Sequence, residues 1–407
     1  MERSQASAGD HHGESVPEPY LPDELSLSRY WNAARLPSEC RTTDGRALQI
    51  VYRGQWSYGY GPDFRGAILC FDGGRAVRGD VEVHVCSSGW VRHGHDSNPA
   101  YDKVVLHVVW MHDAEIPSGA PVLELSRYVR EEDLEGLAQP GALDESICSV
   151  FSSPEQGERA LRIVEAAGDR RFEARCVTLE GELSCETPGQ VLYVALMECM
   201  GYSENKLPFR LLAEALPLET LAHTDAMRVF DRLNAASGLD PATLGERLLQ
   251  REQWRLGRVR PANHPLRRML GAAQLIASAE RNGGLVRHLV EDGIYLGMDG
   301  LLRRLQARPR EGDPPCIGAD RAVDIACNAV LPLAVALARS TGDTGLETAT
   351  RNAWLELPRG GTTRVERSMR DHLQAPPRGA KLNKARHQQG LLHLYKRTLQ
   401  LHVPPRS

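Results

Sequence analysis

The chain has 407 residues, of which 42% are hydrophobic and 25% charged, and its formal charge of −4 corresponds to a pI near 6.4. A chain of this length exceeds one ordinary hydrophobic core, so we expect two folded parts. The small negative charge excludes wholesale electrostatic wrapping by nucleic acid or by a membrane surface, and any polyanion must meet a local basic patch.

The N-terminal residues 1–20 are polar, acidic and without periodicity, which predicts a disordered tail in which His11 and His12 hold no metal. No apolar stretch follows a basic start, and no segment approaches the roughly 20 apolar residues of a membrane helix. We therefore expect a cytoplasmic protein with no membrane partner. The nine cysteines form no CxxC pair, which predicts free thiols.

The first folded part is predicted to be an α+β domain over residues 21–150. Apolar residues at helical spacing predict an amphipathic helix over Pro22–Ala34. The mixed segment Ser87–Lys103 is predicted to include a second, short helix. Runs rich in β-branched residues predict five strands, at Ala47–Tyr52, Asp63–Phe71, Ala76–Cys86, Val104–Trp110 and Val122–Leu125.

Residues 151–407 are predicted to form an all-α domain with essentially no β-sheet, because helical periodicity replaces the strand pattern. No fixed repeat appears, which favours an irregular bundle over a solenoid. The last segment, Pro358–Ser407, holds eleven Lys or Arg against two acids and is the candidate for contact with nucleic acid, the alternative being a solvated end. The predicted helices are Glu158–Ala174, Gln190–Met200, Pro208–Leu216, Asp225–Ala236, Pro265–Arg281 and Ala322–Ser340.

The residues most suited to chemistry lie on the second and third predicted strands. If the turn at residues 72–74 is the tip of a hairpin, Asp63 is expected opposite His84 and Arg65 opposite Glu82. Directly paired residues point to one face of a sheet. Carboxylates and an imidazole are therefore expected to converge from adjacent strands.

A divalent cation is the expected partner of these groups. The period of two in a strand puts Asp80, Glu82 and His84 on one face. Like charges held close in a half-buried site repel and lose hydration, and a cation relieves both penalties. Oxygen ligands favour Mg²⁺ or Mn²⁺, while an imidazole also admits Zn²⁺. The alternative is a polar sheet face that only meets water.

The order of helix, three-stranded meander, helix and further strand resembles the PD-(D/E)XK phosphodiesterase superfamily, which includes many nucleases. The resemblance covers residues 22–125 and rests on Pro62-Asp63 at the start of one strand and Glu82-Val83-His84 on the next. It implies that Asp63 and Glu82 are metal ligands and that Glu24 is an additional acid. His84 stands where the superfamily has lysine, and an imidazole acts as general base or metal ligand instead of a fixed positive charge.

A second resemblance, to a bacterial family catalogued as a domain of unknown function, covers most of the chain. It implies a two-domain unit and assigns no activity. The motifs that carry it are Gly61-Pro62-Asp63-Phe64, Gly79–His84, Trp90, His93-Gly94-His95, Tyr101-Asp102, Leu106–Val109, Gly201-Tyr202, Asn205-Lys206, Arg260–Asn263 and Gln388–Leu392.

The remaining histidines allow several interpretations. With His107, the pair His93 and His95 could ligate a separate zinc ion; alternatively the pair borders the same metal cleft and contacts substrate phosphate, or belongs to a structural loop. Asp102 is a candidate for the same substrate or supporting role. His107 itself is either a core histidine with one hydrogen bond or a partner that holds a metal-bound carboxylate in place.

The leading hypothesis is a metal-dependent phosphodiesterase, a nuclease, in which Asp63 and Glu82 hold Mg²⁺ or Mn²⁺ and His84 assists proton removal. Three alternatives remain. The chain could be a catalytically inactive nucleic-acid-binding module, a zinc-dependent hydrolase of a small molecule that uses Glu82 with the three histidines just described, or a scaffold with no site. The sequence identifies no dedicated protein partner.

Overall fold

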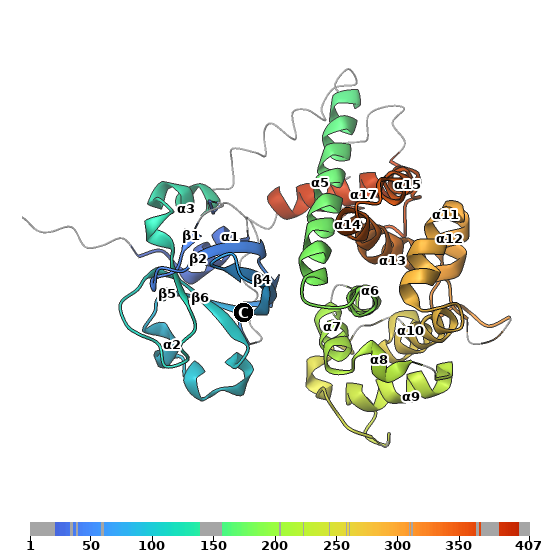
Figure 1. Ribbon diagram of the computed structural model, residues 1–407, viewed down its shortest axis with the longest axis horizontal. Helices are drawn as coiled ribbons and strands as arrows, with labels where there is room; N and C mark the ends of the chain where they lie inside the picture. Colours follow the sequence, from blue (N-terminus) through green and yellow to red (C-terminus); the bar gives the residue numbers. More distant parts are fainter. Residues whose placement is uncertain are drawn as a thin grey trace, which may run out of the picture.

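A computed structural model (Figure 1) places a sheet, built by the first third of the chain, beside a body of helices. The predicted tail at residues 1–20, the boundary near residue 150 and half of the basic C-terminal segment lie outside the described residues. These are 21–32, 36–37, 40–57, 61–138, 157–202, 205–222, 224–243, 245–257, 259, 261–308, 310, 312–363, 366–367 and 382–398.

One mixed sheet contains all the strands of the described residues. Its order is β1-β2-β4-β5-β6-β7, with β3 paired to β4; the pairs up to β5 are antiparallel, and β5, β6 and β7 are parallel. The elements are α1 (Glu24–Asn32), β1 (Cys40–Arg41), β2 (Ala47–Tyr52), β3 (Gln55–Trp56), β4 (Phe64–Phe71), β5 (Val77–Cys86), α2 (Gly89–Arg92), the 3-10 turns His95–Ser97 and Pro99–Tyr101, β6 (Val104–Met111), β7 (Val122–Glu124), the 3-10 turn Leu125–Arg127 and α3 (Glu131–Ala138).

The two faces of the sheet differ in character. Leu27 and Trp31 of α1 pack with Val81 and Val83 in one apolar core, on the face that α1 covers. The even-numbered residues of β5 therefore point to the opposite face, as the period of two predicts. Glu82 is among them, and it is buried.

A β-bulge sets which side chains meet across β4 and β5. Near the hairpin tip Ala67 lies opposite Gly79, but beyond the bulge Phe64 lies opposite Val81. Gly66 supplies the bulge with a left-handed φ of 63°, which a residue without Cβ adopts at little cost. The extra residue turns Phe64 into the core. Without it, Phe64 would point to the polar face.

The predicted partners across this hairpin are corrected by the same bulge. Asp63 lies beside Glu82 and not opposite His84, because its backbone N–H donates to Glu82 Oε2 over 3.0 Å. Arg65 pairs with Gln55 of β3 and not with Glu82. Asp63 and Glu82 nevertheless share one face of the sheet, as predicted. The pairing near the hairpin tip differs from the expected one by one residue and the bulge adds a second, and a shift of two residues leaves each side chain on its expected face.

The helical part contains no strand among its described residues, only the isolated bridges Ala307–Ile317 and Pro358–Lys384. The predicted fold class, an α+β unit followed by helices, is confirmed. The helices are α5 (Gly157–Leu183), α6 (Pro188–Met200), α7 (Lys206–Ala215), α8 (Leu218–Leu221), α9 (Ala226–Ser237), α10 (Pro265–Glu280), α11 (Asp292–Tyr295), α12 (Gly297–Leu305), α13 (Ala319–Ile325), α14 (Leu331–Thr341), α15 (Thr344–Glu356) and α17 (Ala385–Thr398), with 3-10 turns at Arg251–Gln253 and Pro261–Asn263 and π-turns at Arg287–Glu291 and Ala326–Val330.

The run from α13 to α14 is one apolar helix, Ala319–Thr341. By length and composition it could cross a membrane, and no other helix in the described part of the chain is long and apolar enough to do so. However, 83% of its apolar window is buried inside the protein, as in the core helix of a bundle. The sequence had predicted a helix here and no segment of membrane-spanning length.

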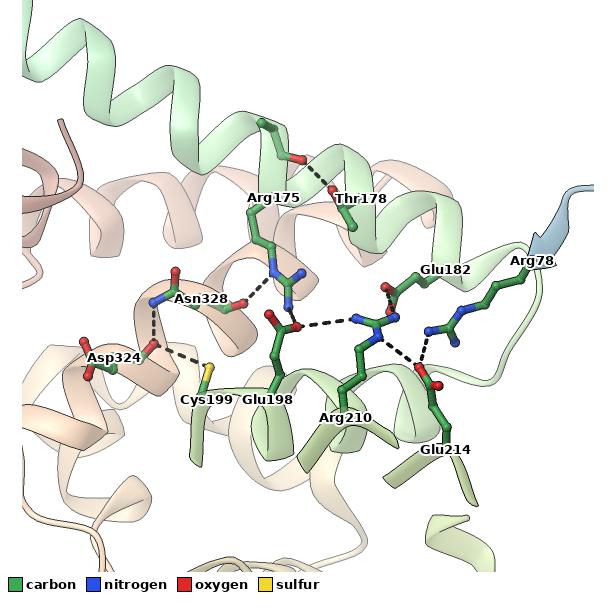
Figure 2. Close-up of polar contacts among 11 residues, drawn as sticks. Arg78, Arg175, Thr178, Glu182, Glu198, Cys199, Arg210, Glu214, Asp324 and Asn328 are labelled. Atoms are coloured by element: carbon green, nitrogen blue, oxygen red, sulfur yellow. Dashed lines mark hydrogen bonds and ion pairs between the residues drawn. The ribbon is translucent and has the colours of Figure 1, made fainter. Parts of the chain in front are cut away.

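A balanced ion network joins the sheet to the helices (Figure 2). Its centre is Arg210, which is 4% exposed; its Nη2 lies 2.9 Å from Glu182 Oε1, its Nε 2.9 Å from Glu214 Oε1 and its Nη1 3.4 Å from Glu198 Oε2. Arg175 adds a 3.1 Å contact to Glu198. The network reaches the sheet because Arg78 of β5 pairs with Glu214. Three guanidinium groups thus meet three carboxylates.

Candidate metal centre

Three segments bring polar side chains together on the face of the sheet opposite α1. Strand β5 carries Glu82 and His84, and the neighbouring strand β6 carries His107, in register with Glu82. The connection between these strands carries His93 and His95. Because β5 and β6 are parallel, this connection must cross over the sheet, and it places both histidines above the two strands.

Four donor atoms from these segments lie close together. His84 Nε2 lies 3.0 Å from His93 Nδ1 and 3.6 Å from Glu82 Oε1, and His95 Nε2 lies 3.1 Å from the same carboxylate oxygen. One nitrogen of each imidazole belongs to a group whose members are all within 4.8 Å of one another. Glu82, His84 and His95 are buried and His93 is exposed, so the group is reached from solvent at His93.

The donor spacing suits a metal ion. Ligands about 2.0–2.1 Å from a tetrahedral zinc ion lie roughly 3.3 Å apart. Within this group His84 Nε2 and His93 Nδ1 lie 3.0 Å apart, and Glu82 Oε1, which is not one of its members, lies 3.1 Å from His95 Nε2 and 3.6 Å from His84 Nε2. Both ring nitrogens of His95 are buried and neither makes a hydrogen bond, although Nε2 lies 3.1 Å from Glu82 Oε1. A cation held by His84, His93, His95 and Glu82 would satisfy Nε2, the nitrogen that faces the carboxylate.

The buried imidazoles of His84, His95 and His107 have lowered pKa values, which favours the neutral form that binds metals. Burial lowers the pKa of His84 far below its usual range, and His107 and His93 lower it further. Burial likewise lowers the pKa of His107 to about 3. His107 Nε2 lies 2.8 Å from His84 Nδ1, a contact that fixes the orientation of the His84 ring and leaves its Nε2 for the cluster. His107 is thus a core histidine with one hydrogen bond, the first of the two roles expected for it, and its partner is an imidazole and not a carboxylate.

The carboxylates carry the opposite shift. Burial raises the pKa of Glu82 well above its ordinary value, and the negative charge of Asp63 raises it further. Burial also raises the pKa of Asp63, although the Val83 N–H that donates to its Oδ2 over 3.1 Å lowers it. Glu24, the first residue of α1, adds negative charge to both. The superfamily resemblance named these three acids as metal ligands, and that role stays a prediction.

The turn that carries His93 and His95 depends on Gly94. Its φ of 70° lies in the left-handed region, and this reversal directs the two flanking histidines to one centre. The Tyr101 ring stacks on the His95 ring at 3.8 Å between centroids. Burial raises the pKa of Tyr101 to about 12, and the charges of Glu82 and Asp63 raise it as well, so its hydroxyl stays protonated beside the carboxylates.

Other predicted residues lie at the edge of the centre or outside it. Asp102 is exposed at the end of the Pro99–Tyr101 turn, outside the ligand group described above. Asp80 lies on the same face, where its Oδ1 accepts the Gly66 N–H over 2.9 Å. Arg65 had no predicted role, yet its charge lowers the pKa of both Asp80 and Tyr101 against the effect of burial. Its spacing of two from Asp63 was the signal that could have identified it.

The comparisons with known proteins identify a family without an activity. The sequence matches one family model over residues 24–235, described as "Protein of unknown function (DUF2851)". The match runs from the first residue of α1 into α9 and includes the whole candidate metal centre. No curated protein and no solved structure matches the chain. Because the match spans just over half of the chain, the protein belongs to this family of unknown function, as its sequence motifs predicted.

Proposed function

We propose that the protein is a metal-dependent phosphodiesterase that acts on nucleic acid. The observation that carries the proposal is the convergence of Glu82 with three imidazoles, beside the second carboxylate of Asp63. The element order supports it by analogy: one helix, an antiparallel meander, a short helix and a parallel strand resemble the PD-(D/E)XK arrangement. Asp63 and Glu82 occupy the two acidic positions of that motif.

The types of ligand atom limit which metal ions the site can bind. The sequence favoured Mg²⁺ or Mn²⁺, since it showed two acids and one histidine. Three imidazoles with one carboxylate are instead suited to Zn²⁺ or Mn²⁺, because imidazole is a poor ligand for magnesium. We therefore propose Mn²⁺ or Zn²⁺ at His84, His93, His95 and Glu82.

The protein's own residues would then have separate tasks. A bound ion would act as a Lewis acid on a phosphoryl oxygen and lower the pKa of a water molecule. Glu82 and the imidazoles would hold the ion, and His107 would keep the His84 ring in place. Asp63, held at one oxygen by the Val83 N–H, is positioned to accept a proton. Arg65 would supply the fixed positive charge that His84 does not.

Glu82→Gln is the direct test. Purified protein with Mn²⁺ or Zn²⁺ should cleave members of a panel of single- and double-stranded DNA and RNA substrates. The substitution keeps the side-chain shape but removes a charged ligand, so cleavage should fall by several orders of magnitude while the circular dichroism spectrum is unchanged. A panel left uncut by the unsubstituted protein with either metal would contradict the proposal and favour an inactive nucleic-acid-binding module.

His84→Lys separates two roles for this residue. As a metal ligand, His84 cannot be replaced by lysine, and both metal content and cleavage should be lost. If instead it stands in for the superfamily's lysine, cleavage should persist or rise. His112→Gln is the matched control, because His112 lies at the end of the same sheet but contacts Ser87 and Glu115 outside the metal centre.

The histidine-rich donor set also favours a second function, a zinc-dependent hydrolase of a small molecule. The ligands would differ from those predicted for it, because His84 takes the place of His107. Bound zinc, retained activity on a small phosphodiester or ester and no cleavage of any nucleic acid would support this function over the nuclease.

A further inference from the structure

Two buried arginines lie close together in the helical part without a matching number of acids. Arg268 belongs to the first turns of α10 and Arg321 to the first turn of α13, and each is only 6% exposed. Both guanidinium groups lie over the ring of Tyr202, with centroid distances of 5.6 Å for Arg268 and 3.6 Å for Arg321. Segments far apart in the sequence thus build one cationic cluster.

Several donor groups of this cluster lack partners. Arg268 donates from Nη1 to Cys316 O over 2.8 Å and from Nη2 to Asn263 Oδ1 over 2.7 Å, while its buried Nε has no hydrogen bond. Arg321 donates from Nη1 to Cys199 O over 2.8 Å, and its Nε and Nη2 are buried without a hydrogen bond. Unpaired buried N–H groups of a charged side chain are strongly unfavourable.

The surrounding charge is unbalanced. One carboxylate, Asp324, reaches Arg321 at 3.2 Å, and no ion pair to Arg268 is present in the described part of the chain. Burial and, to a smaller extent, the adjacent charge of Arg321 together lower the pKa of Arg268 to about 10. Arg268 also lies near the N-terminal end of α10, which is the positive end of the helix dipole. Like charge is therefore concentrated here.

The contrast with Arg210 shows what is missing. Every nitrogen of that guanidinium faces a glutamate, within 2.9 to 3.4 Å. Arg268 and Arg321 meet backbone carbonyls, an amide and a single carboxylate. An arginine pair of this kind lacks an anion, and a ligand can provide it.

We propose that Arg268 and Arg321 form a binding site for a phosphate group, with Tyr202 as its aromatic wall. Guanidinium groups recognise phosphate oxygens through paired N–H donors, which the free N–H groups of this cluster would supply. Tyr202 is 43% exposed and has a φ of 53°, an uncommon backbone conformation for a tyrosine. Its ring therefore marks the side of the cluster that faces solvent.

The phosphate site stands independently of the proposed hydrolase. It is built from α10, α13 and the residue two positions past the end of α6, none of which carries a metal-centre ligand. Its ligand could be a free phosphate or a phosphate of a nucleic-acid strand. The chemistry recognised is the same in both cases, and the experiment separates the two sources.

Inorganic phosphate is the first probe. It is titrated into the full-length protein while chloride is removed in step, so that the ionic strength stays constant. The melting temperature should rise saturably, and calorimetry should show one site. Arg268→Gln should weaken binding about tenfold to a hundredfold, which is the range for one hydrogen bond to a charged group. Arg228→Gln is the matched control, because Arg228 is a first-turn arginine of α9 that is 78% exposed. It should bind phosphate as the unsubstituted protein does.

A purely structural role for Arg268 predicts a different pattern. It predicts that Arg268→Gln loses the same stability with and without phosphate. The ligand site predicts little or no loss without phosphate, because one of two repelling charges is removed, and loss of the phosphate-dependent gain. If the glutamine variant does not fold, Arg268→Lys tests the proposal instead. Lysine retains the positive charge but lacks the planar guanidinium group with its paired N–H donors, so phosphate binding should still weaken severalfold.

A short single-stranded oligonucleotide is the second probe. If the site takes a strand phosphate, the oligonucleotide should compete with inorganic phosphate, and Arg268→Gln should reduce the dependence of log affinity on log salt by about one unit. If the site takes free phosphate, the oligonucleotide should not compete. Absence of a saturable effect of either probe beyond that of chloride would overturn the proposal.

Discussion

Two buried polar clusters of similar depth differ in how their charges are balanced. The Arg210 network sets three guanidinium groups against three carboxylates, so each group finds an opposite charge within the protein. The candidate metal centre sets the Glu82 carboxylate beside the negative charge of Asp63 and beside His84 and His95, whose pKa values are lowered by burial. The first cluster is complete without a ligand. In the second, burial and a neighbouring acid raise the pKa of Glu82, which is consistent with the cation that we propose for it.

The pKa shifts express the same difference. Burial raises the pKa of Glu198, but Arg175 and Arg210 outweigh it and hold the pKa at about 2. At the metal centre burial and like charge act together, and they raise the pKa of Glu82. Equal burial therefore stabilises or destabilises an ionised glutamate according to the charges beside it.

The largest expected effect on stability comes from Arg210→Met. The substitution leaves Glu182 and Glu198 buried without their central cation, and breaking a buried pair in this way costs about 3–5 kcal/mol. Denaturant unfolding measures the loss. Arg228→Met, which removes an exposed pair with Asp225, should cost no more than about 1 kcal/mol. Equal losses in the two variants would show that the network does not stabilise the fold.

Acid should remove the contribution of Glu198. Its pKa is about 2 in the folded protein against an ordinary value of 4.5, so the unfolded chain takes up the proton first as the pH falls. The contribution, on the order of 3 kcal/mol, should be complete above pH 4.5 and be lost as the pH falls toward 2. Urea unfolding across this range should show the loss, and Glu198→Gln should lack that part of the slope.

Metal addition should stabilise the other cluster. A Zn²⁺ or Mn²⁺ concentration one hundred times the Kd should add about 2.7 kcal/mol, because only the folded state assembles the ligands. This added stability should be measurable as a rise in melting temperature that a chelator reverses. His95→Gln should abolish the rise, whereas Arg228→Met should retain it. A rise that survives in His95→Gln would place the ion elsewhere.

The smallest expected change in stability gives the most direct comparison, because a glutamate is replaced by glutamine once in the candidate metal centre and once in the Arg210 network. In metal-free protein Glu82→Gln should be neutral or stabilise by about 1 kcal/mol, because the amide has no charged form that burial and Asp63 disfavour and it keeps an acceptor for the Asp63 N–H. Glu182→Gln should instead destabilise, since Arg210 loses its closest counter-charge. Destabilisation of metal-free protein by both substitutions would contradict the proposed difference between the clusters.

The sequence by itself determined the elements and their faces. Alternation along β5 predicted that Glu82 shares a face with His84, and the structure places their side chains 3.6 Å apart. Helical periodicity predicted α6 and α9 to within two residues at either end. These features follow from patterns of two and 3.6 residues, which are local properties of the chain. The short elements β1, β3 and α3 were missed because so few residues give no measurable period, and the longer helices α12, α15 and α17 were missed as well.

Only the tertiary structure decided which groups meet. The bulge at Gly66 changed the partner of Asp63, and the left-handed Gly94 turned His93 and His95 toward Glu82. The sequence pattern does not predict the φ of Gly66 or Gly94, because glycine adopts positive and negative φ with similar ease. The contacts of Arg78 with Glu214 and of Arg268 with Tyr202 join residues far apart in the chain. Such pairs depend on how whole helices pack, and one sequence carries no local signal for that packing.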